Sequence, residues 1–283
     1  WFMKSKYQKH LTKLRFFIGD VRDYRRLEKA LIDVDMVIHA AATKIVSTAE
    51  YDPFECVKTN VVGAMNVIDA CINRNIPRVL ALSTDKACNP INLYGSTKLA
   101  SDKLFIASNH YASKSSTKFS IMRYGNVINS RGSVIPFFLE MKNLNKSLPV
   151  TDKNMTRFFI SLNDAIISCL DAFSNMVGGE IFVKKCKSLK ILDLAKAVSK
   201  NIKIIGVRPG EKIHEIMIDK NETNNTYEFK DHFRIVPRIF SEKIVNQISK
   251  RGKLVKKNFE YVSNLNNDWF SKKEIDNIIN SNI

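Results

Sequence analysis

The sequence predicts an α/β protein: a Rossmann-like, doubly wound parallel sheet followed by a smaller C-terminal region. Short apolar runs alternate with longer segments of helical periodicity over the first half of the chain, which is the pattern of βαβ units. The alternation becomes irregular after about residue 129. Hydrophobic residues make up 45% of the 283 residues, which is enough for a packed core. No apolar run approaches the roughly 18 residues of a membrane span.

The first half of the chain contains the strands and helices of the expected sheet. Apolar runs predict strands at 14–18, 36–40, 78–82 and 118–123. Helical spacing predicts helices at 24–31, 53–72 and 93–111. Pro53 stands at an early helical position, where proline is tolerated, and Asn92 is a suitable N-cap for the third helix.

The second half is less regular. We expect helices at 134–143, 163–174 and 191–199, strands at 180–183 and 203–205, and a mobile loop at 219–230. This change divides the chain into residues 1–128, a partial cofactor-binding domain that carries the catalytic residues, and residues 129–283, a substrate-binding region.

A glycine-rich phosphate turn is not found in the sequence. The chain has ten glycines but no G-x-G-x-x-G, the turn that normally follows the first strand of a dinucleotide-binding fold. The run at 14–18 would be the third strand of such a fold. We therefore expect that the first strand, the turn and the second strand are missing, and that the sequence, which starts at Trp1, is truncated at its N-terminus.

The chain is strongly basic, with 45 Lys and Arg against 28 Asp and Glu and a formal net charge of +17. Such a balance can indicate a nucleic-acid or membrane-surface partner. The basic residues are spread along the chain, however, and their densest cluster, at 250–257, has no interleaved aromatic residues on which bases could stack. We favour an anionic small-molecule substrate, with no nucleic-acid and no membrane partner.

Cysteine and histidine spacing indicates neither a disulfide framework nor a metal site. The five cysteines are odd in number and lack a C-x-x-C pair, and the five histidines show no ligand spacing. The N-terminal residues are basic and polar and do not resemble a signal peptide. Reduced thiols and a cytoplasmic location are expected.

Groups that can exchange protons are concentrated between residues 83 and 98. Ser83 and Thr84 end a predicted strand, the pair Asp85-Lys86 follows, and Tyr94 and Lys98 lie four residues apart on one helical face. An ammonium beside a phenol favours the phenolate, which makes tyrosine usable as an acid/base for oxidation of a hydroxyl to a ketone. Taken alone, Asp85-Lys86 also fits an ordinary surface pair.

This segment resembles the extended short-chain dehydrogenase/reductases. The finer similarity is to the inverting UDP-N-acetylglucosamine 4,6-dehydratases of pseudaminic acid synthesis, and it covers nearly the whole chain. It is carried by STDKACNPINLYGSTKLASDKLF, RYGNVINSRGSVIPFF, MTRFF, GGEIFV and IIGVRPGEKIHE. Retaining 4,6-dehydratases have Asp-Glu where this chain has Asp85-Lys86, whereas the inverting enzymes have Asp-Lys.

The resemblance implies a catalytic set of Thr84, Asp85, Lys86, Tyr94 and Lys98. Hydride would leave sugar C4 for NADP while Tyr94 takes the hydroxyl proton. Lys86 would then remove the C5 proton and Asp85 would protonate the departing C6 hydroxyl, before hydride returns to C6 and C5 is reprotonated on the opposite face. This needs a neutral Lys86 and a protonated Asp85, so we expect burial to lower the pKa of Lys86 from about 10.4 and raise that of Asp85 from about 3.9.

The resemblance also implies binding residues. Those implied for the cofactor are Asp20, Val21, Ala40, Ala41, Ser83, Tyr94 and Lys98. Those implied for the substrate are Lys44, Asn126, Arg157, Arg208 and Glu211, with the two arginines suited to phosphate. NADP is the expected cofactor and NAD stays open, because the ribose-discriminating segment lies in the part expected to be missing. A homo-oligomer is implied as well.

Two other interpretations stay open at this point. One is another sugar-nucleotide enzyme of the same fold, such as a 4-epimerase, although epimerases lack the Asp-Lys pair. The other is non-enzymatic: an inactive fragment, or a basic protein that binds nucleic acid.

Overall fold

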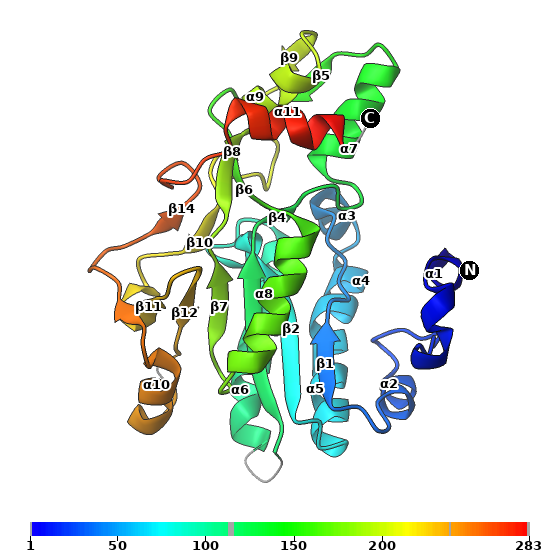
Figure 1. Cartoon of the computed structure of the whole chain (residues 1–283), viewed down its shortest axis with the longest axis vertical. Helices are drawn as coiled ribbons and strands as arrows, with labels where there is room; N and C mark the ends of the chain where they lie inside the picture. Colours follow the sequence, from blue (N-terminus) through cyan, green and yellow to red (C-terminus); the bar gives the residue numbers. More distant parts are fainter. Residues whose placement is uncertain (1, 113–115, 238, 282–283) are drawn as a thin grey trace.

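A large mixed sheet forms the base of the molecule (Figure 1). The computed structural model describes residues 2–112, 116–237 and 239–281. The strand order is β1-β2-β3-β7-β12-β11-β13. The first four are parallel and the last three add in antiparallel pairs. Their bounds are β1 Met36–His39, β2 Arg78–Thr84, β3 Lys118–Tyr124, β7 Ile181–Lys184, β11 Thr226–Glu228, β12 His232–Ile235 and β13 Lys253–Leu254. The predicted fold class is confirmed.

Helices cover both faces of this sheet. On one face, α5 (Gly63–Asn73) and α6 (Leu93–Tyr111) bury apolar residues against β2 and β3, with Phe105 and Phe119 in the centre of the core. On the other face, α8 (Leu162–Asn175) packs Cys169, Ala172 and Phe173 against Leu80 and Met122. The doubly wound arrangement therefore follows from apolar residues on both sides of β2 and β3.

A smaller upper lobe has its own core. It contains a sheet of β4 (Asn126–Val127), β6 (Thr156–Ile160) and β8 (Lys187–Lys190), and a pair of β5 (Leu148–Val150) and β9 (Ile202–Ile204). Around them lie α7 (Val134–Asn143), α9 (Ile191–Val198) and α11 (Lys272–Asn280) (Figure 1). Their buried side chains form a cluster that includes Phe138, Leu148 and Leu194.

The remaining elements lie outside these sheets and the helices that cover them. They are α1 (Phe2–Lys6), α2 (Tyr24–Ala30), α3 (Val46–Tyr51), α4 (Pro53–Val57), β10 (Ile216–Ile218), α10 (Glu242–Ser249) and β14 (Tyr261–Val262). Segments of 3-10 helix lie at η1 (Gln8–Lys13), η3 (Asp85–Ala87) and η5 (Thr223–Asn225), and a π-helical turn, η2 (Lys58–Val62), joins α4 to α5. The predicted helix at 53–72 is thus α4, η2 and α5 in continuous succession.

Two strand predictions need correction. Residues 14–18 form no strand: Phe17 is 48% and Ile18 95% exposed, and the segment pairs with no strand in the described part of the chain. The reason is that an apolar run becomes a strand only where a neighbour accepts its hydrogen bonds. β1 is present but is an edge strand rather than a buried one, with only His39 buried.

The expected mobile loop at 219–230 is also wrong. Its polar residues form η5 and β11, and Thr223 and Thr226 are buried. The Glu222 carboxylate accepts hydrogen bonds from the buried Arg123 guanidinium at 3.1 and 3.2 Å. Specific partners for its polar side chains therefore order a segment whose composition is that of a loop.

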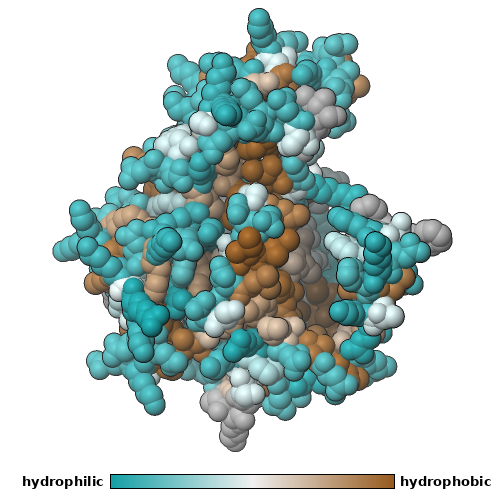
Figure 2. All heavy atoms as spheres, in the orientation of Figure 1, coloured by the Kyte–Doolittle hydropathy of each residue, from teal (hydrophilic) through white to brown (hydrophobic). Residues whose placement is uncertain are grey.

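The outer face of α8 is apolar and exposed. Figure 2 shows a hydrophobic band over this helix, to which Leu162, Ile166, Ile167 and Leu170 contribute. Among the described residues no helix is both long and apolar enough to cross a bilayer.

Candidate active site

A cavity of about 1130 Å³ opens where the carboxyl ends of β1 and β2 meet the base of the upper lobe. Parallel α/β sheets bind ligands at this edge because the loops that follow the strands diverge there. The cavity takes residues from both predicted regions of the chain. Those from the first region include Ala40, Lys44, Ser83, Thr84, Lys86, Tyr94, Lys98 and Asn126, and those from the second include Arg131, Arg157, Arg208, Glu211, Lys212 and Glu215.

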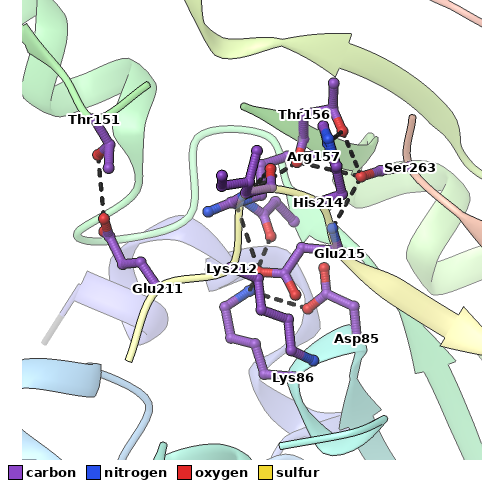
Figure 3. A network of polar contacts seen from close by, with 12 residues as sticks. Asp85, Lys86, Thr151, Thr156, Arg157, Glu211, Lys212, His214, Glu215 and Ser263 are labelled. Carbon is purple, nitrogen blue, oxygen red and sulfur yellow. Dashed lines mark hydrogen bonds and ion pairs between the residues drawn. The ribbon is translucent and has the colours of Figure 1, made fainter. Parts of the chain in front are cut away.

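The Asp85-Lys86 pair lies in η3, directly after β2. The Thr84 side chain caps this turn by accepting a hydrogen bond from the backbone N–H of Lys86, and its hydroxyl donates to Asp85 Oδ1 at 2.9 Å. The Lys86 ammonium donates to the same Asp85 oxygen at 3.0 Å (Figure 3). Asp85 is fully buried, and its Oδ2 has no hydrogen-bond partner in the described part of the chain.

The charge state expected for Lys86 is not the one that the site favours. Burial lowers the pKa of Lys86, but the carboxylates of Asp85 and Glu215 act in the opposite direction and outweigh it, so the pKa lies above its ordinary value. The expectation of a lowered Lys86 pKa is therefore wrong. It considered burial, Lys98 and the nicotinamide, and did not include the carboxylate of Glu215 from a distant part of the sequence.

Tyr94 and Lys98 lie on the first turns of α6, whose start is fixed by Asn92. The Asn92 side-chain oxygen accepts from the backbone N–H of Gly95 at 2.8 Å, which satisfies one of the free donors of the first turn. The Asn92 amide nitrogen donates to the carbonyl oxygen of Gly210 at 2.8 Å, which ties the 208–212 segment to this helix. Tyr94 is 8% exposed and faces the cavity.

Lys98 does not activate Tyr94 in the way expected from spacing. Its Nζ donates to the carbonyl oxygen of Leu82 at 2.8 Å, and burial lowers its pKa. Burial raises the pKa of Tyr94 to about 12, although Lys86 acts in the opposite direction. The phenol is therefore protonated in this structure, and the expected phenolate-favouring shift is wrong for these residues by themselves.

The residues expected to hold a dinucleotide divide into two groups. Ala40, Ser83, Tyr94 and Lys98 line the cavity together. Val21, Ala41 and Asp20 are not part of its lining, and Asp20 is exposed and pairs with Arg22 at 2.7 Å. The first group fits the nicotinamide end of a cofactor, since small residues at the ends of β1 and β2 leave space beside a phenol and an ammonium.

All five residues expected to hold substrate line the cavity. Asn126 Oδ1 accepts from Lys86 Nζ at 3.4 Å, and Glu211 Oε2 accepts from the Thr151 hydroxyl at 3.1 Å. Arg157 lies beside Lys86, 8% exposed, and donates to the carbonyl oxygens of Thr156 and Ile213. Lys44 and Arg208 complete the set.

Sequence reasoning missed Glu215, Lys212 and Arg131. Glu215 is 2% exposed, and its Oε1 lies 3.5 Å from both Lys86 Nζ and Arg157 Nε (Figure 3). Lys212 Nζ donates to the carbonyl oxygen of Cys88 at 2.6 Å. The signal for Glu215 was its place as the last residue of IIGVRPGEKIHE, the motif that also contains Arg208 and Glu211. No metal-binding group of His, Cys, Asp or Glu occurs among the described residues.

A family model described as polysaccharide biosynthesis protein matches residues 2–237. The chain belongs to this family. It is 53% identical over 275 residues to the UDP-N-acetylglucosamine 4,6-dehydratase (inverting) of Campylobacter jejuni subsp. jejuni serotype O:23/36 (strain 81-176), an alignment covering 94% of this chain and 82% of that relative. It is 44% identical over 229 residues to the UDP-glucose 4-epimerase of Rickettsia conorii, covering 79% of this chain and 67% of the relative.

Solved structures agree with the family. Pen from Bacillus thuringiensis superposes with a TM-score of 0.88 at 34% identity, over 99% of this chain and 86% of Pen. The dTDP-glucose 4,6-dehydratase DesIV from Streptomyces venezuelae, with NAD and TYD bound, superposes with a TM-score of 0.65 at 22% identity, over 71% of this chain and 69% of DesIV. The second likeness shows the shared fold.

Proposed function

We propose that the family member described here dehydrates UDP-N-acetylglucosamine at C4, C5 and C6 with inversion at C5, giving a UDP-4-keto-6-deoxy-hexose. The observation that carries this proposal is the Asp85-Lys86 pair: an acid and an amine 3.0 Å apart, beside the cavity that Tyr94 lines. The 53% identity to a dehydratase named inverting supports the same reaction.

Ala40, Ser83, Tyr94 and Lys98 would hold the nicotinamide end of the cofactor, which when bound would supply hydride transfer from C4 and back to C6. A positively charged nicotinamide bound beside Tyr94 would favour the phenolate. Tyr94 would then accept the O4 proton and so promote ketone formation at C4. The ketone acidifies the proton on C5, which the Lys86 amine removes. Asp85 gives its proton to the C6 hydroxyl, which leaves as water, and C5 then takes a proton derived from solvent on the opposite face.

The hydrogen bond between Lys86 and Asp85 provides the charge states that this step needs. Transfer of one proton from Lys86 Nζ to Asp85 Oδ1 along this 3.0 Å contact makes the amine neutral and the acid protonated. The transfer leaves the net charge of the buried site unchanged, so no charge has to be desolvated. Elimination returns Lys86 to an ammonium and Asp85 to a carboxylate.

The broader assignments are part of the same proposal. Residues 1–128 would chiefly bind NADP, with NAD as the alternative, and residues 129–283 would bind the UDP-sugar through Arg157, Arg208 and Glu211, together with Lys44 and Asn126 at the mouth. The exposed apolar face of α8 supports a homo-oligomer. Five unpaired, buried cysteines are consistent with a reducing compartment such as the cytoplasm. The product would enter pseudaminic acid or surface-polysaccharide synthesis.

Incubation of the protein with UDP-N-acetylglucosamine and catalytic NADP in D2O tests the reaction. We expect a 4-keto-6-deoxy product with inverted C5 and one deuterium at that carbon, measured by NMR. The Asp85→Asn variant should lose turnover by about 10²- to 10⁴-fold, since it cannot protonate the leaving hydroxyl. Absence of a keto product would contradict the assignment, and retention at C5 would contradict the role of Lys86.

The identity to a relative named UDP-glucose 4-epimerase favours a second candidate, C4 epimerisation. The same spectra separate the two activities, because an epimerase keeps the C6 hydroxyl and yields a C4 epimer. Normal turnover by Asp85→Asn would favour the epimerase.

A further inference from the structure

Glu215 is a buried carboxylate at the centre of the site's charges, directly before β10. Its Oε1 lies 3.5 Å from Lys86 Nζ and 3.5 Å from Arg157 Nε, so one oxygen is shared between two cations. Its Oε2 is buried and has no hydrogen-bond partner in the part of the chain that the structure describes. Figure 3 shows the Glu215 side chain directed toward the Asp85-Lys86 pair.

The Glu215 backbone is held rigidly. Its N–H donates to the Ser263 hydroxyl at 2.9 Å, and its carbonyl oxygen accepts from the Ser263 N–H at 2.9 Å. The Ser263 hydroxyl also contacts the Thr156 hydroxyl at 2.6 Å, and Thr156 contacts His214 Nδ1 at 2.8 Å. Burying a carboxylate costs free energy unless charged partners compensate for it. Lys86 and Arg157 are the cations beside Glu215, so its position is tied to the charges of the site.

We propose that Glu215 is a positioning residue that determines which partner of the Asp85-Lys86 pair carries their shared proton. The inference deepens the proposed dehydratase function and rests on it for its catalytic meaning. Glu215 stabilises the ammonium form of Lys86 and keeps the amine directed into the cavity. Arg157, at the same distance from the same Glu215 oxygen, offsets part of this attraction and so allows the proton to move to Asp85.

The proton on Lys86 responds to all the charges around it. Asp85 comes from η3, Glu215 from the segment before β10, Arg157 from β6 and the neutral phenol of Tyr94 from α6. Two carboxylates and two cations balance, and their mutual contacts are buried, where Coulomb interactions are weakly screened. Removing Glu215 should favour the neutral amine of Lys86. Removing Arg157 should favour its ammonium form.

Competitive acetylation measures this proton without any turnover, because acetic anhydride reacts only with the neutral amine. The protein is labelled with limiting reagent between pH 7 and pH 10, and the Lys86 peptide is quantified by mass spectrometry against that of the exposed Lys103. Glu215→Gln should acetylate Lys86 about tenfold faster, with the rate-against-pH curve shifted about one unit lower. Glu215→Asp should lie closer to the unmodified protein.

Matched variants separate this effect from a general change in the pocket. Glu211→Gln removes a carboxylate four residues away that lines the same cavity but bonds Thr151, and it should leave the Lys86 rate unchanged. Arg157→Gln should slow the acetylation of Lys86, whereas Arg157→Lys, which keeps the charge, should change it less.

An unchanged Lys86 rate in Glu215→Gln with a wild-type circular dichroism spectrum would overturn the proposal. If that variant does not fold, Arg157→Gln decides: slower labelling supports the proposal, and an equal or faster rate overturns it. Product formation from UDP-N-acetylglucosamine is measured separately on the unmodified protein. A failure of the proposed function is thereby distinguished from a failure of the role given to Glu215.

Discussion

His39, the last residue of β1, shows how a single buried group makes stability depend on pH. It is 5% exposed, with its ring centroid 5.5 Å from that of Phe105. Burial lowers the pKa of His39 to about 4, and the nearby Lys98 acts in the same direction. In the unfolded chain the His39 imidazole is protonated as the pH falls through about 6.5, whereas in the folded chain it stays neutral down to about pH 4. Stability is therefore full above about pH 6.5 and falls as the pH drops through that interval.

The His39→Leu variant should be less sensitive to acid than the unmodified protein. Linkage gives a loss of about 2 kcal/mol between pH 7 and pH 5 from this histidine alone, and the variant should be spared that loss. Urea unfolding at the two pH values measures it, with His10→Leu, at an exposed position, as the control. The same pH dependence in both variants would contradict the assignment.

At the residue scale, sequence spacing grouped side chains that the structure also brings together where those residues are close in the chain. Lys86 and Tyr94 lie in one short segment, and the structure brings their side chains to a single cavity. It failed for Glu215, because no spacing rule links this residue to Lys86 across 129 positions. The charge on Lys86 was mispredicted for the same reason: electrostatics depends on neighbours in space.

At the scale of elements, the close approach of α6 to η3 sets the position of Lys86. Gly95, in the first turn of α6, faces the backbone of η3. A Cβ placed there would lie far inside van der Waals contact with the carbonyl oxygen of Lys86. The absence of a side chain at residue 95 therefore allows the helix of Tyr94 to pack directly on the turn of Asp85 and Lys86.

The Gly95→Ala variant should separate these two elements. We expect turnover to fall about a hundredfold, because a shift of about 1 Å at reacting groups has that effect. Overpacking should also reduce the free energy of unfolding by about 1–3 kcal/mol. Steady-state kinetics and thermal unfolding measure the two effects, with Lys103→Ala, on the exposed side of α6, as the control. Unchanged turnover would show that the contact can relax.

Element prediction was best for helices with regular apolar spacing. The range 93–111 matches α6 at both ends, since Asn92 supplies a clear N-cap. It was worst for strands, whose existence depends on a partner: 14–18 has none among the described residues, whereas β6 and β8 pair with each other and were missed. Such pairings join residues that are distant in the sequence, so local composition does not contain them.

At the scale of the whole molecule, two cores lie on either side of the cavity. Phe105, Phe119 and Ile121 belong to the core of the large sheet, and Leu148 and Leu194 to that of the upper lobe. Each core can lose packing by itself, because its buried residues contact mainly one another. The two parts should therefore open locally with different free energies.

Leu194→Ala tests this separation. Leu194 is fully buried, so its truncation should cost about 2–5 kcal/mol and raise hydrogen exchange mainly in α7, α9 and α11. Leu80→Ala, equally buried but beneath α8, is the matched control and should raise exchange mainly in β2 and β3. A uniform increase throughout the molecule in both variants would indicate one cooperative unit.

The double use of the Asn92 amide has a consequence for engineering. Its oxygen starts the helix of Tyr94 and its nitrogen holds the segment of Arg208 and Glu211. A chimera that imports this segment from another sugar-nucleotide enzyme must therefore keep the main-chain carbonyl oxygen of residue 210 within hydrogen-bond distance of the Asn92 amide. Without this hydrogen bond, exchange of the segment would also disturb the start of the helix that carries Tyr94, and the two could not be changed independently.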